Sequence, residues 1–264
     1  MVTRSHRVRK LRALSGSCFV LYVEGPIPET LPGQFYMVRT EDRWPVLLPR
    51  PLSLYDRAGD GSAGSFLVKA VGPGTRALSA LRPGENVVLT GPLGRPFPDS
   101  IEDPLCIAGG VGLAPFLLLG RLRAARGLGP LRLLFGGRDR AALAGMEDFD
   151  GLSRLHASTD DGSFGFRGLV TELLEDLIHR GEASASDTVF CCGPDPMMHA
   201  VARICLGRGQ RCFLSLETRM ACGYGVCNGC TVRVKGGRFG DWPYSKACTE
   251  GPVYEASELV LGEG

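Results

Sequence analysis

This 264-residue sequence has no apolar run long enough to cross a membrane. The longest run, at residues 105–120, is broken by glycines and ends at Arg121, short of the roughly 20 apolar residues that a spanning helix needs. The first 17 residues, MVTRSHRVRKLRALSGS, also lack the apolar core of a secretory signal. We therefore expect a chain that is not inserted in a membrane and that works in the cytoplasm.

The sequence also carries little net charge. Its 30 Lys and Arg residues against 28 Asp and Glu residues give +2, so a surface for nucleic acid is not expected. A disulfide scaffold is not expected either, because the chain is long and has no secretory signal. We expect six of its ten cysteines to be buried thiols: Cys18, Cys106, Cys191, Cys192, Cys205 and Cys212.

The other four cysteines form a metal-binding pattern. They are Cys222, Cys227, Cys230 and Cys248, spaced C-x4-C-x2-C with a distant fourth. This is the plant-type spacing for a [2Fe–2S] cluster held by four thiolates. Glycines lie between the ligands, where a tight loop must let backbone N–H groups approach the cluster sulfurs.

A zinc-binding scaffold is the alternative interpretation of these cysteines. Structural zinc sites favour two short C-x2–4-C pairs, whereas here the first gap is longer and the last cysteine stands alone. The spacing therefore favours the iron–sulfur cluster.

The first hundred residues predict short antiparallel strands. Apolar runs at residues 17–25, 33–41, 65–72 and 86–91 are separated by Pro and Gly, as in an antiparallel barrel or sandwich.

Two segments in this region could hold phosphates. Arg50 offers a fork that matches a diphosphate, and GPGT at residues 72–75 opens a short helix whose N-terminus could receive an anion.

After residue 100 the pattern changes to alternating strands and helices, which predicts a parallel α/β sheet. GGVGLAP, at residues 109–115, occupies the first strand-to-helix turn, where such sheets bind a dinucleotide pyrophosphate. It is not the G-x-G-x-x-G fingerprint of the standard dinucleotide fold. A second landmark, CGP at residues 192–194, follows a later strand.

These motifs together resemble the ferredoxin-reductase superfamily, and within it the family of electron-transfer subunits of NAD-linked dihydroorotate dehydrogenases. The resemblance covers nearly the whole chain, including STDDGSFGFRGLVTELL at residues 158–174 and ACTEGPVY at residues 247–254. It implies a multidomain α+β fold. Its parts would be an antiparallel β-barrel FAD domain (residues 1–99), a parallel α/β nicotinamide-binding domain (100–215) and a small C-terminal [2Fe–2S] subdomain (216–264).

The resemblance also implies site residues. Arg50 would hold the FAD pyrophosphate, and Ser53 would face the reactive flavin nitrogen. The full set of implied FAD contacts is Arg50, Pro51, Leu52, Ser53, Val68, Lys69, Ala70, Gly74 and Thr75. Leu52 departs from the family, because many members carry an aromatic residue there.

For the nicotinamide cofactor, the implied contacts are Gly109, Gly110, Gly112, Cys192 and Gly193, with Asp160. NADPH-using relatives offer cations near the position of Asp160, whereas here carboxylates would repel a 2′-phosphate and accept from a ribose hydroxyl. We therefore expect NAD as the cofactor.

The resemblance implies a function in pyrimidine biosynthesis. An FMN-containing dihydroorotate dehydrogenase catalytic subunit, in a complex with two copies of each chain, would send electrons through the [2Fe–2S] cluster and FAD to NAD⁺. The residues that flank the cluster ligands, Met220, Tyr224, Val226 and Asn228, include apolar side chains, and we expect this rim of the cluster loop to dock the partner. The alternative enzyme is an FAD/[2Fe–2S] NAD(P)H oxidoreductase subunit that serves ferredoxin or a hydrogenase. We expect this chain itself to supply no catalytic acid, base or nucleophile.

Overall fold

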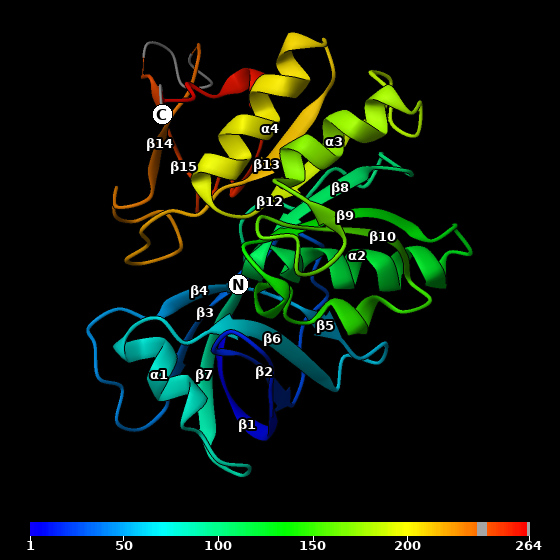
Figure 1. Cartoon of the computed structure of the whole chain (residues 1–264). Coiled ribbons are helices and arrows are strands. Elements are labelled where there is room, and N and C mark those ends of the chain that lie inside the picture. The colour runs from blue at the N-terminus through cyan, green and yellow to red at the C-terminus, as the bar shows by residue number, and fades with distance from the viewer. Residues whose placement is uncertain (237–241, 263–264) are drawn as a thin grey trace.

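The computed structural model describes residues 1–236 and 242–262. Figure 1 shows a sheet formed by the N-terminal part of the chain below, a second sheet with three helices above it, and the C-terminal segment beside α4. No helix in the described ranges has the length and apolar character needed to cross a membrane.

The first sheet has seven antiparallel strands in the order β4-β3-β7-β1-β2-β6-β5. The strands are β1 (Val2–Ala13), β2 (Cys18–Glu24), β3 (Phe35–Thr40), β4 (Arg50–Ser53), β5 (Asp56–Arg57), β6 (Ala63–Lys69) and β7 (Asn86–Leu93). The sheet curls until β4 lies against β6, which confirms the expected antiparallel barrel architecture. β-branched and aromatic side chains fill its interior, as the strand propensities predict. The helix α1 (Pro73–Ser79) follows β6, as expected from the GPGT turn.

The second sheet has the order β11-β10-β9-β8-β12-β13-β16. Its strands are β8 (Leu105–Gly109), β9 (Leu131–Gly137), β10 (Ser153–Thr159), β11 (Phe166–Arg167), β12 (Val189–Cys192), β13 (Cys212–Ser215) and β16 (Val253–Glu255). All pairs are parallel except β13 with β16. The chain starts at β8, builds outward on one side and then crosses to β12, so strand order reverses between β8 and β12. Sheets of this kind bind ligands at such a reversal, beyond the carboxyl ends of the strands.

Helices cover both faces of the second sheet. The helix α2 (Ala114–Ala125) packs on one face, and α3 (Val170–His179) and α4 (Asp195–Gly207) pack on the other (Figure 1). Alternate residues of β8 supply the two cores: Cys106 joins the α2 side and Ile107 the side of α3 and α4. This doubly wound arrangement confirms the α/β prediction.

The core on the α2 side continues into the first sheet. Val20, Tyr55 and Leu67 of the barrel belong to the same buried cluster as Phe116 and Leu117 of α2. The two sheets are therefore joined by a shared apolar core.

The C-terminal segment returns to both sheets. After the cysteine loop, the strands β14 (Thr231–Arg233) and β15 (Tyr244–Lys246) pair antiparallel in a small sheet of their own. The strand β16 then adds an antiparallel edge to the second sheet. The ion pair between Arg95 and Glu250 (3.2 Å) also ties this segment to the end of the barrel. The division of the chain at residues 99 and 215 remains a prediction.

Candidate functional site

A cavity of about 840 Å³ opens between the barrel and the carboxyl ends of β8 and β12. Eleven of the expected cofactor residues line it: Arg50, Pro51, Leu52, Ser53, Val68, Lys69, Thr75, Gly109, Gly110, Gly112 and Cys192. Four do not line it directly: Ala70, Gly74, Gly193 and Asp160. Residues from separate segments of the sequence, between positions 50 and 192, thus line the same cavity.

Strand β4 forms the barrel wall of this cavity. It pairs with β3, with Ser53 opposite Phe35 and Arg50 opposite Val38. Arg50 donates to the carbonyl oxygen of Leu48 at 3.2 Å, and no carboxylate in the described part of the chain forms an ion pair with it. A guanidinium without an acidic partner, at the edge of a cavity, suits a diphosphate ligand.

Gly74 and Thr75 shape the turn beside Arg50. A Cβ at Gly74 would lie 2.9 Å from the Trp44 ring and 3.2 Å from Nε of Arg50, so only glycine lets these side chains approach. The Thr75 hydroxyl accepts from the backbone N–H groups of Val71 (3.0 Å) and Gly72 (3.1 Å). Both residues therefore hold the turn in place, and Thr75 also reaches the cavity.

The two nicotinamide loops are in direct contact. A Cβ at Gly112 would lie 2.2 Å from the carbonyl oxygen of Cys192, and one at Gly193 would lie 3.0 Å from the backbone nitrogen of Gly109. Gly110 has φ +53°, which glycine adopts without strain. The glycines at these positions thus let the ends of β8 and β12 close on each other.

Cys192 is buried in this contact. Burial, and then the charge of Glu217, raise the pKa of its thiol to about 12. The sulfur therefore stays protonated near neutral pH and has little nucleophilic character.

Glu217 is a cavity residue that the sequence did not suggest. Burial, and then the charge of Asp195, raise the pKa of its carboxyl group. Its position just after β13 places a partly desolvated carboxyl group between the nicotinamide loops and the cysteine loop.

Two further segments that the sequence did not suggest line the mouth of the cavity. The β1–β2 turn contributes residues 16–18, and the turn after β9 contributes Arg138, Asp139, Ala141 and Ala142. The Ser15 hydroxyl donates to the carbonyl oxygen of Ala141 at 2.7 Å, which joins the two segments.

Asp160 lies just outside the cavity on an exposed turn. Its backbone N–H donates to Gly137 at 3.0 Å, and that of Asp161 donates to Arg138 at 3.2 Å. The neighbouring carboxyl of Asp161 has a lowered pKa, because Ser163 donates hydrogen bonds to it. These backbone hydrogen bonds hold the Asp160 turn against the turn after β9, whose Arg138 lines the cavity.

The four expected metal ligands lie in two pairs. The sulfurs of Cys222 and Cys227 are 3.3 Å apart, and those of Cys230 and Cys248 are 3.2 Å apart. Two thiolates on one tetrahedral metal, each about 2.3 Å from it, lie about 3.8 Å apart. Within residues 1–236 and 242–262, no three Cys, His, Asp or Glu side chains converge on one metal position. Two thiolate pairs match the four-cysteine ligand set of a [2Fe–2S] cluster.

The backbone around Cys222 favours its thiolate form. Burial alone would raise the pKa of the Cys222 thiol, but backbone N–H groups, first that of Cys227, lower it to about 6. Gly223 and Gly225 adopt φ values of +82° and +89°, as the tight loop requires. The Lys246 ammonium donates to the carbonyl oxygen of Gly225 at 2.8 Å and fixes the loop to β15.

The cysteine loop rests on the barrel next to the cavity. A Cβ at Gly223 would lie 2.6 Å from Cγ of Met37, on β3. Met220 is buried and lines the cavity. The expectation that Met220 belongs to an exposed rim is therefore wrong, because its side chain packs in a core with Phe35 and Met37. Met220 stands two residues before Cys222, the first expected cysteine ligand, so the cysteine loop begins at the cavity wall.

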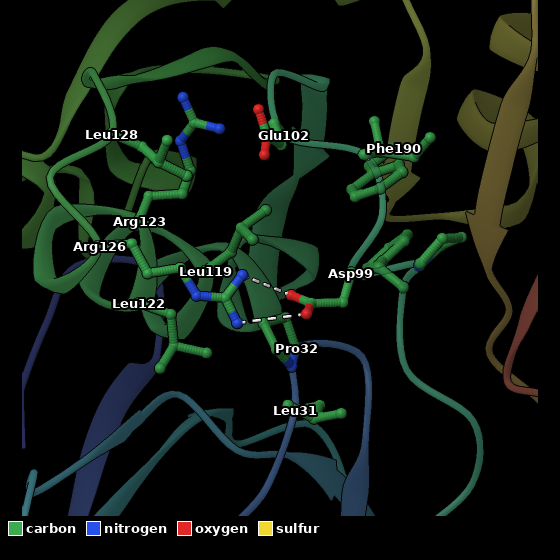
Figure 2. Close-up of a pocket in the computed structure, with 13 residues that line it drawn as sticks. Leu31, Pro32, Asp99, Glu102, Leu119, Leu122, Arg123, Arg126, Leu128 and Phe190 are labelled. Atoms are coloured by element: carbon green, nitrogen blue, oxygen red, sulfur yellow. Dashed lines mark hydrogen bonds and ion pairs between the residues drawn. The ribbon is translucent and has the colours of Figure 1, made fainter.

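A second, smaller cavity of about 240 Å³ lies on the seam between the barrel and α2. Figure 2 shows Leu31 and Pro32 of the barrel below it, and the paired side chains of Arg126 and Asp99 across it. This ion pair is bidentate, at 2.8 and 3.3 Å. None of the expected cofactor residues lines this cavity.

Comparisons with known proteins agree with this geometry. Residues 217–260 match a family model described as the iron–sulfur cluster binding domain of dihydroorotate dehydrogenase B. Residues 106–203 match the oxidoreductase NAD-binding domain.

Relatives described as the electron transfer subunit of dihydroorotate dehydrogenase B (NAD(+)) align with most of the chain. That of Clostridium acetobutylicum is 37% identical over 238 residues, which are 89% of this chain and 88% of the relative. That of Shouchella clausii is 35% identical and covers 92% of each. The chain belongs to this family.

Solved structures give the same fold. An NADH-dependent reduced ferredoxin-NADP oxidoreductase, described in connection with flavin-based electron bifurcation, superposes with a TM-score of 0.84. It is 25% identical and covers 97% of this chain and 90% of its own. Phthalate dioxygenase reductase (17% identical, TM-score 0.66, covering 89% of this chain and 87% of its own) shares the fold. These comparisons confirm the expected family, the fold and the cofactor classes.

Proposed function

We propose that this chain is the electron transfer subunit of a dihydroorotate dehydrogenase, joining an FMN-containing catalytic subunit to NAD⁺. The observation that carries the proposal is the single cavity in which β4, the loop with Gly109 and Gly112, and Met220 meet. When bound, a [2Fe–2S] cluster supplies one-electron steps and FAD joins them to two-electron hydride chemistry.

Each group of residues around the cavity would bind a different part of the cofactors. Arg50 would bind the FAD diphosphate, while Ser53 and Val68 would line the flavin ring site. The close-packed loops at Gly112 and Cys192 would hold the nicotinamide side of the cavity and exclude water from it. The cysteine loop, packed on Met37, would hold the cluster beside the barrel.

The partner surface is proposed to surround the exposed side of the cysteine loop. Val226 and Tyr224 are 78% and 47% exposed, and Trp242 and Tyr244 form an exposed aromatic pair with ring centroids 5.4 Å apart. Exposed aromatic side chains of this kind suit the core of a protein–protein interface. We propose a complex with two copies of each subunit, as the family resemblance implies, and mass measurement of the reconstituted complex tests that stoichiometry.

We also propose that the protein works in the cytoplasm. All ten cysteines lie in the described part of the chain and none forms a disulfide. The six that are not expected metal ligands are buried, as the sequence predicted. Free thiols of this number suit a reducing compartment.

Reconstitution tests the function. The purified chain, mixed anaerobically with an FMN-containing dihydroorotate dehydrogenase subunit, should reduce NAD⁺ when dihydroorotate is added, and neither subunit alone should do so. Stable mixing of the two chains without any dihydroorotate-dependent NADH formation would contradict the proposal.

A ferredoxin-linked oxidoreductase is the second candidate, favoured by the structural similarity over 97% of this chain. The same preparation distinguishes the two. Rapid NAD⁺ reduction with reduced ferredoxin, and none with dihydroorotate and its dehydrogenase, would favour the second candidate.

A further inference from the structure

The seam between the barrel and the second sheet contains a buried polar link. Tyr55, which follows β4, is 1% exposed and lies in the same apolar cluster as Leu113 and Ala114 at the start of α2. Its hydroxyl donates to Oδ2 of Asp148 at 2.7 Å. Asp148 lies on the short helix η3 (Met146–Phe149) of the nicotinamide half, so this hydrogen bond crosses the seam.

Further contacts fix the link from both sides. The Arg12 guanidinium of β1 forms an ion pair with the same Oδ2 of Asp148, and its Nε donates to the Tyr22 hydroxyl at 3.3 Å. Gly145 has φ +88°, and a Cβ there would lie 2.9 Å from the Tyr55 hydroxyl and 3.7 Å from the Leu113 side chain. The segment at residues 145–148 therefore closes tightly on Tyr55.

The charges around the link are balanced. Asp148 supplies one negative charge and Arg12 one positive charge. Burial, and then Asp148, raise the pKa of Tyr55 well above its usual value. Its hydroxyl therefore remains a hydrogen-bond donor throughout the physiological pH range.

The link joins the two walls of the cofactor cavity. Tyr55 is two residues beyond Ser53, on the flavin wall, and Leu113 is next to Gly112, on the nicotinamide wall. The cavity in Figure 2 lies elsewhere on the same seam, between Leu31 and Pro32 of the barrel half and α2. Tyr55 and Asp148 are thus placed where they can set the separation of the walls.

We propose that Tyr55 and Asp148 are positioning residues, which hold the nicotinamide loop at the distance from β4 that hydride transfer between NADH and FAD requires. This inference rests on the proposed function. A misplacement of about 1 Å remote from the reacting atoms can slow a reaction about a hundredfold, so a link of this kind has a measurable kinetic consequence.

Anaerobic stopped-flow reduction of the bound FAD by NADH tests the proposal in the full-length protein. Tyr55→Phe removes the hydroxyl and keeps the ring. We expect it to lower the limiting rate constant about tenfold or more, to weaken the flavin–nicotinamide charge-transfer absorbance, and to leave FAD content unchanged. Tyr36→Phe is the matched control, because it removes a buried hydroxyl that contacts only Thr30 of the barrel half, at 2.8 Å, and it should behave as wild type.

Asp148→Asn gives a second variant that keeps an acceptor for Tyr55 and removes the charge. We expect a smaller fall in the same rate constant and a weaker charge-transfer band. A wild-type rate and band in either variant, with FAD bound, would overturn the positioning role. Failure of NADH to reduce FAD in the wild-type protein would instead overturn the proposed function.

Discussion

Gly112→Ala should separate the two nicotinamide loops while leaving the rest of the protein in place. A Cβ at this position would lie 2.2 Å from the carbonyl oxygen of Cys192 and 2.6 Å from the backbone nitrogen of Gly193. Both contacts are with backbone atoms, so no side chain can rotate away. The loops must therefore move apart by about 1 Å to reach an ordinary contact distance, at an overpacking cost of about 1–3 kcal/mol.

The effect on activity follows from that displacement. A shift of about 1 Å in a reacting geometry costs up to about a hundredfold, or about 2.7 kcal/mol of transition-state stabilisation. We expect kcat/KM for NADH-driven reduction of a dye to fall by about tenfold to a hundredfold. FAD and iron content should stay at wild-type values, because β4 and the cysteine loop are not in this contact.

Gly120→Ala is the matched control. This glycine lies within α2, and a Cβ there would meet its nearest neighbour, Leu152, at 3.6 Å, which is an ordinary contact. The control should retain NADH-driven activity and melt at or above the wild-type temperature. A folded Gly112→Ala protein with undiminished kcat/KM would refute the argument that the loops must touch.

Three other predictions concern the cofactors and the partner. Arg50→Ala should weaken FAD binding by about 1.5–3 kcal/mol, the range for a charge-assisted hydrogen bond, and leave the iron content unchanged. A flavin occupancy equal to that of the wild-type protein would show that the diphosphate binds elsewhere. NADH should reduce the flavin far faster than NADPH, and the double variant Asp160→Ala with Asp161→Ala should lower the ratio of the two rates. Equal wild-type rates with both cofactors would contradict the expectation that these carboxylates select NAD. Tyr224→Glu should leave NADH-driven dye reduction intact and lower the rate of dihydroorotate-dependent NAD⁺ reduction at limiting partner concentration. An undiminished rate in this variant would exclude the exposed side of the cysteine loop as the docking site.

Local patterns in the sequence predicted most of the regular structure. The apolar runs before and after residue 100 became strands in both sheets, and the helix expected after the GGVGLAP turn is α2 (Ala114–Ala125). These elements are specified by side-chain periodicity and by Gly and Pro at their ends. The cysteine spacing likewise indicated four thiols that the structure brings together in two pairs, Cys222 with Cys227 and Cys230 with Cys248.

Long-range assembly could not be predicted in the same way. The strand β16 has three residues and exists through pairing with β13, almost 40 positions earlier. Met220 lies in a polar, glycine-rich stretch that looks exposed, yet tertiary packing on Phe35 and Met37 buries it. Glu217, Arg138 and the link from Tyr55 to Asp148 became visible only when separate segments were brought together.

The proposed function requires that this one chain holds a [2Fe–2S] cluster beside a flavin. The iron, acid-labile sulfide, zinc and FAD content of protein purified without exposure to oxygen tests this requirement. We expect two irons, two sulfides and one FAD per chain, with the iron and sulfide lost in Cys227→Ser. Stoichiometric zinc in place of iron would contradict it.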